Sequence, residues 1–125
     1  MSDERQRGMQ FFGDVFGGQQ ESALGEHLVS SEFGKECATW AADFAFGTVW
    51  TREGLDRKTR SCLTLALLTA LRAENELPMH VRAARRNGLT PAEIKEVFLH
   101  AAVYAGVPAA NSAFAIAQRT LAEEG

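Results

Sequence analysis

The sequence predicts an all-α protein of about six helices. Apolar residues recur at intervals of three and four along most of the 125 residues, as they do on one face of a helix. Residues typical of helix starts (Ser, Thr, Asp and Pro) and of helix ends (Gly) divide these stretches from one another. No segment alternates between apolar and polar residues as a half-buried strand would. There is no internal repeat, low-complexity tract or linker, so we expect residues 1–125 to form one domain.

The first predicted helix lies at the start of the chain. Ser2 is a suitable N-cap, and the glycine pair at 17–18 is expected to end the helix. Its apolar face is formed by Met9, Phe12 and Phe16. Residues 19–30 fit either a loop or a loose helix, and the sequence leaves both open.

A second helix is predicted to begin at Ser30 or Ser31. Its apolar residues step by four, three and four, which indicates one continuous stripe: Phe33, Cys37, Trp40 and Phe44. Residues 47–54 then read as a turn.

The third helix is predicted over residues 57–73, with Asp56 as its N-cap. Leucine and alanine surround it almost completely, and a helix that is apolar all round is buried. We therefore place it at the centre of the domain or in a subunit interface. The predicted core comprises Leu63, Leu67, Leu71, Val97, Phe98 and Phe114.

Three further helices follow. Pro78 fits the first turn of the fourth helix and Gly88 its end. Residues 90–93, Thr-Pro-Ala-Glu, form a capping box that opens the fifth helix. Gly106 ends the fifth helix, and Pro108 starts the last one.

The composition excludes several classes of function. The formal net charge of −3 and the pI of about 5.6 argue against a nucleic-acid-binding protein or one that binds anionic membranes. The longest apolar run is too short to span a bilayer, and the polar start does not resemble a signal peptide, so we expect a cytoplasmic protein. Cys37 and Cys62 lie in apolar helical surroundings without a CxxC motif, and we expect both to be inert.

His80 is the main candidate for chemistry. It lies one turn after Glu76, and a histidine beside a carboxylate can hold or relay a proton. Ordinary packing of a partly buried histidine is the alternative. Arg82 belongs to a separate basic stripe that is either solvated or available to an acidic substrate. The three histidines lack HxxxH or HExxH spacing, so no metal site is expected.

Three stretches in this order resemble the carboxymuconolactone decarboxylase family: FGTVWTREGLDRKTRSCLTLALLTAL, ELPMHVRAARRNGLTPAEIKEV and AAVYAGVPAANSAFAIA. The resemblance covers residues 46–121. It implies the alkylhydroperoxidase D-like helical fold and a homotrimer or homohexamer. The implied activity is cofactor-free decarboxylation of a lactone carboxylate, 4-carboxymuconolactone, to 3-oxoadipate enol-lactone in protocatechuate (beta-ketoadipate) catabolism.

The resemblance also bears on the site residues. Peroxidase-type relatives carry a CxxCxxxH motif, which, aligned on His80, would place cysteines at Ala73 and Glu76. Both thiols are absent, so the resemblance favours acid-base catalysis by His80, with Glu76 orienting its ring. Arg82 is the expected substrate-binding cation, and Ser61, which replaces an acidic residue of those relatives, is a second expected substrate contact.

Four positions depart from the decarboxylase pattern and suggest that the acid differs from the usual one: Asp43, Phe44, Phe46 and Ala115. Two other interpretations remain open. The same scaffold could catalyse another proton-transfer or ring-opening reaction, or it could be a non-catalytic helical assembly module.

Overall fold

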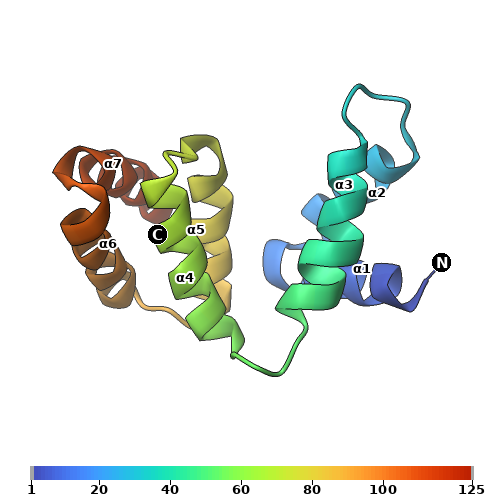
Figure 1. Ribbon diagram of the computed structural model, residues 1–125, viewed down its shortest axis with the longest axis horizontal. Coiled ribbons are helices and arrows are strands. Elements are labelled where there is room, and N and C mark those ends of the chain that lie inside the picture. The colour runs from blue at the N-terminus through green and yellow to red at the C-terminus, as the bar shows by residue number, and fades with distance from the viewer. Residues whose placement is uncertain (1, 125) are drawn as a thin grey trace. The chain divides into compact units, whose positions relative to one another are not determined.

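The computed structural model describes residues 2–124, and over this range every regular element is a helix (Figure 1). The all-α prediction is confirmed. The chain divides into two compact units, Met1–Leu55 and Asp56–Gly125, and each is described by itself.

The first unit contains four helical elements. They are α1 (Asp3–Phe16), α2 (Gly18–Val29), α3 (Glu36–Trp40) and the π-helix η1 (Ala41–Trp50). The Ser2 hydroxyl accepts a hydrogen bond from the backbone N–H of Arg5 at 3.2 Å, so the predicted cap of the first helix is confirmed. Of the two alternatives for residues 19–30, the structure has the helix.

Helices α1 and η1 are in backbone contact. A Cβ atom on Gly8 would lie 1.8 Å from the carbonyl oxygen of Ala42, and one on Gly47 would lie 2.2 Å from the carbonyl oxygen of Glu4. Glycine at both positions therefore permits the close approach. Beside this crossing lies a cluster of aromatic rings: Phe11, Phe12, Phe16, Phe46 and Trp50.

The prediction for residues 30–54 was partly wrong. The helix begins at Glu36, because residues 33–35 form a turn, and η1 continues through Trp50 where a turn had been expected. The predicted apolar stripe faces solvent rather than the core: Phe33, Cys37, Trp40 and Phe44 are all exposed. The opposite face of η1, which includes Ala42 and Phe46, packs against α1 instead.

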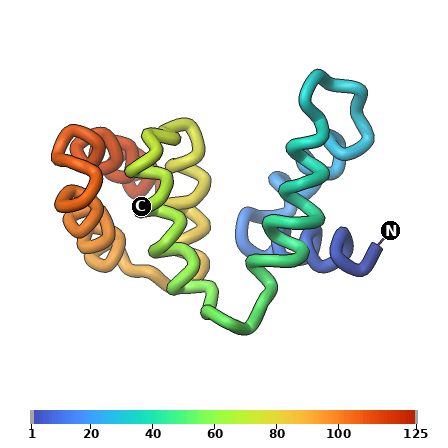
Figure 2. Tube along the Cα trace, in the orientation of Figure 1, coloured from blue at the N-terminus to red at the C-terminus, as the bar shows by residue number. Residues whose placement is uncertain are grey.

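The second unit contains five helical elements. They are α4 (Arg57–Ala70), the short 3₁₀ helix η2 (Glu74–Glu76), α5 (Leu77–Arg86), α6 (Pro91–Ala105) and α7 (Val107–Glu124). Helices α4 and α5 run side by side in opposite directions (Figure 2). The predicted caps are confirmed: Asp56 accepts from the N–H of Thr59 at 2.7 Å, and Thr90 and Glu93 form the capping box.

The core of this unit lies among α4, α5, α6 and α7. Its fully buried side chains include Leu65, Leu77, Val81, Leu89, Ile94 and Phe98. The prediction for Phe98 is confirmed, and Val97 and Phe114 are partly buried against this cluster.

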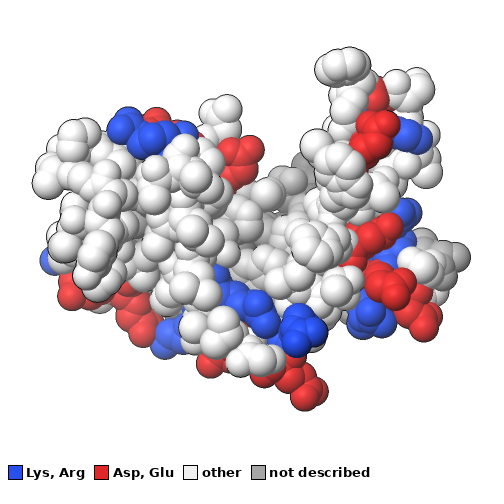
Figure 3. Space-filling view, in the orientation of Figure 1, with Lys and Arg blue, Asp and Glu red and all other residues white. Residues whose placement is uncertain are grey.

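The prediction for the leucines of α4 was wrong. Leu63, Leu67 and Leu71 are 49%, 60% and 74% exposed. The helix turns Ser61, Leu65 and Thr69 inward, and residues two positions further along point the opposite way. In the view of Figure 3, charged side chains gather at the two ends of this unit, and the surface over α4 and α6 is largely uncharged.

Candidate active site

His80 lies in the first half of α5, directly before Val81, which has no exposed surface. The hydrophobic residues of α5 that anchor it in the core are Leu77, Val81 and Ala84. Since the His80 ring is partly buried among these elements, desolvation lowers the pKa of His80 from its ordinary 6.5 to about 4. His80 is therefore a neutral imidazole at pH 7, which can donate one hydrogen bond and accept another.

Glu76 is exposed at the end of η2, one turn before His80. We had expected it to hold the imidazole in its charged form. A neighbouring carboxylate would raise the pKa of His80, whereas burial lowers it, and burial has the larger effect here. A role for Glu76 must therefore be in orienting the ring or meeting the substrate, rather than in keeping the ring protonated.

Ser61 lies inside the unit. Ser61 is 2% exposed, and its Oγ accepts a hydrogen bond from Nδ2 of Asn87 at 2.9 Å. Asn87 shares the face of α5 that carries His80 and Ala84, because these residues are spaced by four and three. This burial argues against the direct substrate contact expected of Ser61. We regard Ser61 instead as a residue that joins α4 to the His80 face of α5.

Arg82 lies on another side of α5. It is two positions from His80, or about 200° around the helix, so the two side chains point in nearly opposite directions. Its Nη1 is 3.6 Å from Oε2 of Glu123 in α7. Within one chain Arg82 is thus poorly placed to bind a substrate that also contacts His80.

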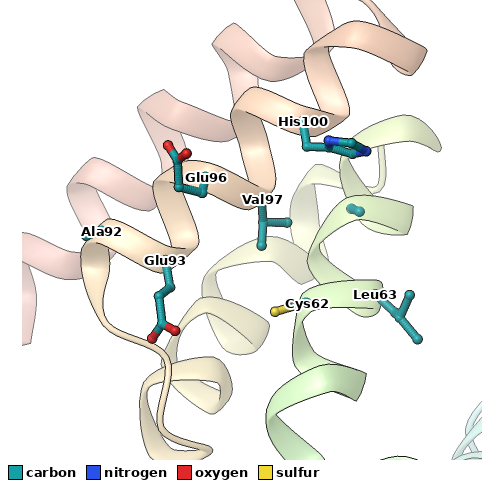
Figure 4. Close-up of a pocket in the computed structure, with 8 residues that line it drawn as sticks. Cys62, Leu63, Ala92, Glu93, Glu96, Val97 and His100 are labelled. Atoms are coloured by element: carbon teal, nitrogen blue, oxygen red, sulfur yellow. The ribbon is translucent and has the colours of Figure 1, made fainter.

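An open groove of about 550 Å³ lies between α4 and α6 (Figure 4). Cys62, Leu63 and Val97 give it an apolar wall, and Glu93, Glu96 and His100 add polar groups. His80 is not among its lining residues. Oε2 of Glu93 also pairs with Nζ of Lys58 at 2.8 Å. The sequence does not predict this groove, because the lining residues come from two helices that are separated along the chain.

The thiols are poorly suited to redox chemistry. Burial raises the pKa of the Cys62 thiol, which disfavours the reactive thiolate. Cys37 is exposed in the first unit, contrary to the buried helical position expected for it. Among the described residues, no group of three or more His, Cys, Asp or Glu side chains could hold a metal ion.

Three of the four positions that depart from the decarboxylase pattern lie in the first unit. Asp43 accepts hydrogen bonds from Nε and Nη2 of Arg5, and this partner lowers the pKa of Asp43. Phe46 is buried in the aromatic cluster, whereas Phe44 is 64% exposed. Ala115 is exposed on α7.

The fold and the site describe an all-helical protein with one partly buried, neutral histidine and no dithiol motif. A profile of the carboxymuconolactone decarboxylase family matches residues 35–119, more than half of the chain. The chain belongs to this family. No helix among residues 2–124 is long and apolar enough to cross a membrane.

Three similar proteins support this membership. The chain is 39% identical to a 4-carboxymuconolactone decarboxylase of Acinetobacter baylyi, in an alignment that covers 100% of the chain and 93% of that protein. It is 45% identical to the nitrosuccinic acid decarboxylase npaB of Metarhizium robertsii, over 86% of the chain and 74% of that protein. An uncharacterised 15.0 kDa protein of Paracoccus denitrificans is 39% identical over 79% of the chain and 78% of its own length. Two of these relatives are decarboxylases, which identifies the chain as a carboxy-lyase.

Proposed function

We propose that the chain decarboxylates 4-carboxymuconolactone to 3-oxoadipate enol-lactone and carbon dioxide, without a cofactor, in protocatechuate catabolism in the cytoplasm. The observation that carries this proposal is the similarity over the whole chain to the decarboxylase of Acinetobacter baylyi. The neutral His80 on α5 supplies the group that the reaction needs.

The substrate itself can accept the electrons of the broken bond. The carbon–carbon bond to the departing carboxylate breaks, carbon dioxide leaves, and the electron pair passes through the ring double bond to the lactone carbonyl oxygen. The furanolate formed in this way then takes a proton on the carbon next to that carbonyl. Two requirements remain for the protein, which are stabilisation of the developing oxyanion and delivery of one proton.

His80 is assigned to the oxyanion. A neutral imidazole can donate a hydrogen bond from one ring nitrogen to the developing oxyanion, and the low pKa of His80 keeps the ring neutral throughout the physiological range. In this proposal, Glu76 orients the ring or guides the proton to carbon. Within one chain, Arg82 points away from His80. We therefore assign Arg82 of a neighbouring subunit to bind the carboxylate that the substrate retains.

This assignment requires an oligomer, and we propose a homotrimer or homohexamer. A large apolar surface is exposed in the single chain. It is formed by Leu63 and Leu67 on α4, Leu71 directly after α4, and Val103 and Tyr104 on α6. Apolar surfaces of this kind usually mark an interface.

A second candidate substrate is a nitro acid such as nitrosuccinic acid. It is supported by the 45% identity to the decarboxylase of Metarhizium robertsii. The chemistry is analogous, because a nitro group on the carbon that carries the departing carboxylate can also accept the electron pair. The departures at Asp43, Phe44 and Phe46 are consistent with an altered acid preference.

The test is to incubate purified protein with enzymatically generated 4-carboxymuconolactone, and separately with nitrosuccinate, and to follow carbon dioxide release. We expect faster release from the lactone than in buffer alone. Faster turnover of nitrosuccinate would favour the second candidate. Release at the buffer rate from both acids by a folded protein would contradict the proposal and favour a non-catalytic assembly module.

A further inference from the structure

Two helices of the second unit end with the same backbone hydrogen bonds but with different residues. At the end of α5, the N–H of Leu89 donates to the carbonyl of Ala84 at 2.9 Å, and Gly88 between them has a φ of 101°. At the end of α4, the N–H of Ala73 donates to the carbonyl of Leu68 at 2.9 Å, and Arg72 has a φ of 57°. This motif usually places glycine at the left-handed position, because a Cβ atom is strained there.

Arg72 is an exception to the backbone pattern of the whole chain. Among residues 2–124, Arg72 is the one residue other than glycine that has a positive φ. The other residues with a positive φ in this range are Gly17, Gly34, Gly88 and Gly106. The left-handed backbone costs free energy that glycine would avoid. The arginine side chain must therefore do something that glycine cannot.

The guanidinium of Arg72 joins three elements of the unit. Its Nε donates to Oε2 of Glu74, the first residue of η2, at 2.8 Å, and its Nη2 donates to Oγ of Ser112 in α7 at 3.1 Å. The side chains of Arg72 and Glu74 are 50% and 37% exposed. Exposed ion pairs stabilise a fold only weakly, so added stability is a poor explanation for arginine at a strained position.

We propose that Arg72 is a positioning residue for the His80 site, which holds η2 against α7 and so sets where α5 begins. This inference rests on the proposed role of His80. Helix η2 ends at Glu76, α5 begins at the next residue, and His80 follows three residues later. Leu77, which joins η2 to α5, has no exposed surface, so a displacement of η2 is passed to the first turn of α5.

The decisive variant is Arg72→Gly, because glycine is the favoured residue for this backbone conformation. We expect a melting temperature equal to or above that of the wild type, a kcat lowered about tenfold to a hundredfold, and a nearly unchanged KM. Arg72→Lys should restore little of the loss, since an ammonium group cannot reach Glu74 and Ser112 in the fixed geometry of a guanidinium. Arg86→Ala, which removes an exposed arginine of α5, is the control and should keep the wild-type kcat.

A second measurement does not need substrate. NMR titration of His80 should show its midpoint moving upward in Arg72→Gly, because a loosened first turn of α5 admits water to the ring. An unchanged kcat together with an unchanged His80 midpoint would refute a positioning role. A raised KM at constant kcat would instead make Arg72 a substrate ligand and would also overturn the proposal. If the wild-type protein releases no carbon dioxide, the proposed function fails, and the titration still decides the role of Arg72.

Discussion

Asn87, which directly follows α5, donates a hydrogen bond to the buried hydroxyl of Ser61 in α4, at 2.9 Å. This bond lies on the face of α5 that carries His80, one turn beyond Ala84. It joins the helix that bears the candidate catalytic residue to its neighbour through two polar groups. Because Ser61 is 2% exposed, water cannot easily reach its hydroxyl in place of Asn87.

Replacing Ser61 with Ala should therefore affect stability more than catalysis. The Asn87 amide would lose its acceptor, which costs about 1–2 kcal/mol of unfolding free energy. Urea unfolding of Ser61→Ala, Asn87→Ala and the double variant should give a coupling energy of about 1 kcal/mol. Strictly additive effects would show that the bond is unimportant. A large loss of turnover in stably folded Ser61→Ala would restore Ser61 as a substrate contact.

Removing the imidazole of His80 should abolish most of the activity. Removal of one oxyanion donor typically costs about a hundredfold to a thousandfold in rate, and we expect a loss in this range for His80→Ala. The loss in His80→Gln should be smaller, because the glutamine amide can still donate a hydrogen bond. Glu76→Gln should have a smaller effect. His27→Gln is the matched control, because His27 is exposed on α2 in the first unit. Wild-type turnover by His80→Ala would show that another residue performs this role.

The lowered pKa of His80 also predicts how stability depends on pH. The pKa of His80 is about 4 in the folded protein and about 6.5 in the unfolded chain, so between these values the unfolded chain binds more protons. Stability should therefore fall as the pH falls from 6.5 to 4, by up to roughly 3 kcal/mol from this group. Denaturant unfolding of His80→Gln should lack this part of the decline. Parallel curves for both proteins would contradict the burial of His80.

The features of the fold that depend on neighbouring residues were predicted well from the sequence. Contacts between residues far apart along the chain were predicted poorly. The caps at Ser2, Asp56 and Thr90 depend on residues three positions apart, so the sequence contains all that is needed to recognise them. The leucines of α4 were misplaced because a helix that is apolar all round does not reveal which face has a partner within the chain.

The candidate site shows the same division. His80, Ala84 and Asn87 are spaced by four and three, which places them on one face of a helix, because helical geometry is local. The partner of Asn87 could not be predicted, since Ser61 lies 26 positions away along the chain. The left-handed backbone of Arg72 could not be predicted either, because arginine has no preference for this conformation. Its hydrogen-bond partner Ser112 lies 40 positions away along the chain.

The cysteines should be dispensable for turnover. Burial raises the pKa of Cys62, Cys37 is exposed, and the sequence contains no CxxC motif. The combined variant Cys37→Ser and Cys62→Ala should keep activity within several-fold of the wild type, once any loss of stability is allowed for. Dithiol-dependent peroxide turnover that disappears in this variant would contradict the decarboxylase proposal.

The exposed leucines of α4 should control the assembly. Leu67 is 60% exposed in the single chain, so Leu67→Glu should leave the fold intact while placing a charge in the proposed interface. Sedimentation should show a trimer or hexamer for the wild type and a shift toward the 13.6 kDa monomer for the variant, with unchanged helical circular dichroism. Gln10→Glu, at an exposed position of α1, adds the same charge and should sediment like the wild type. Turnover should fall with the assembly, because the proposal takes Arg82 from a neighbouring subunit. A wild-type protein that sediments as a monomer at micromolar concentration would refute both the interface and this shared site.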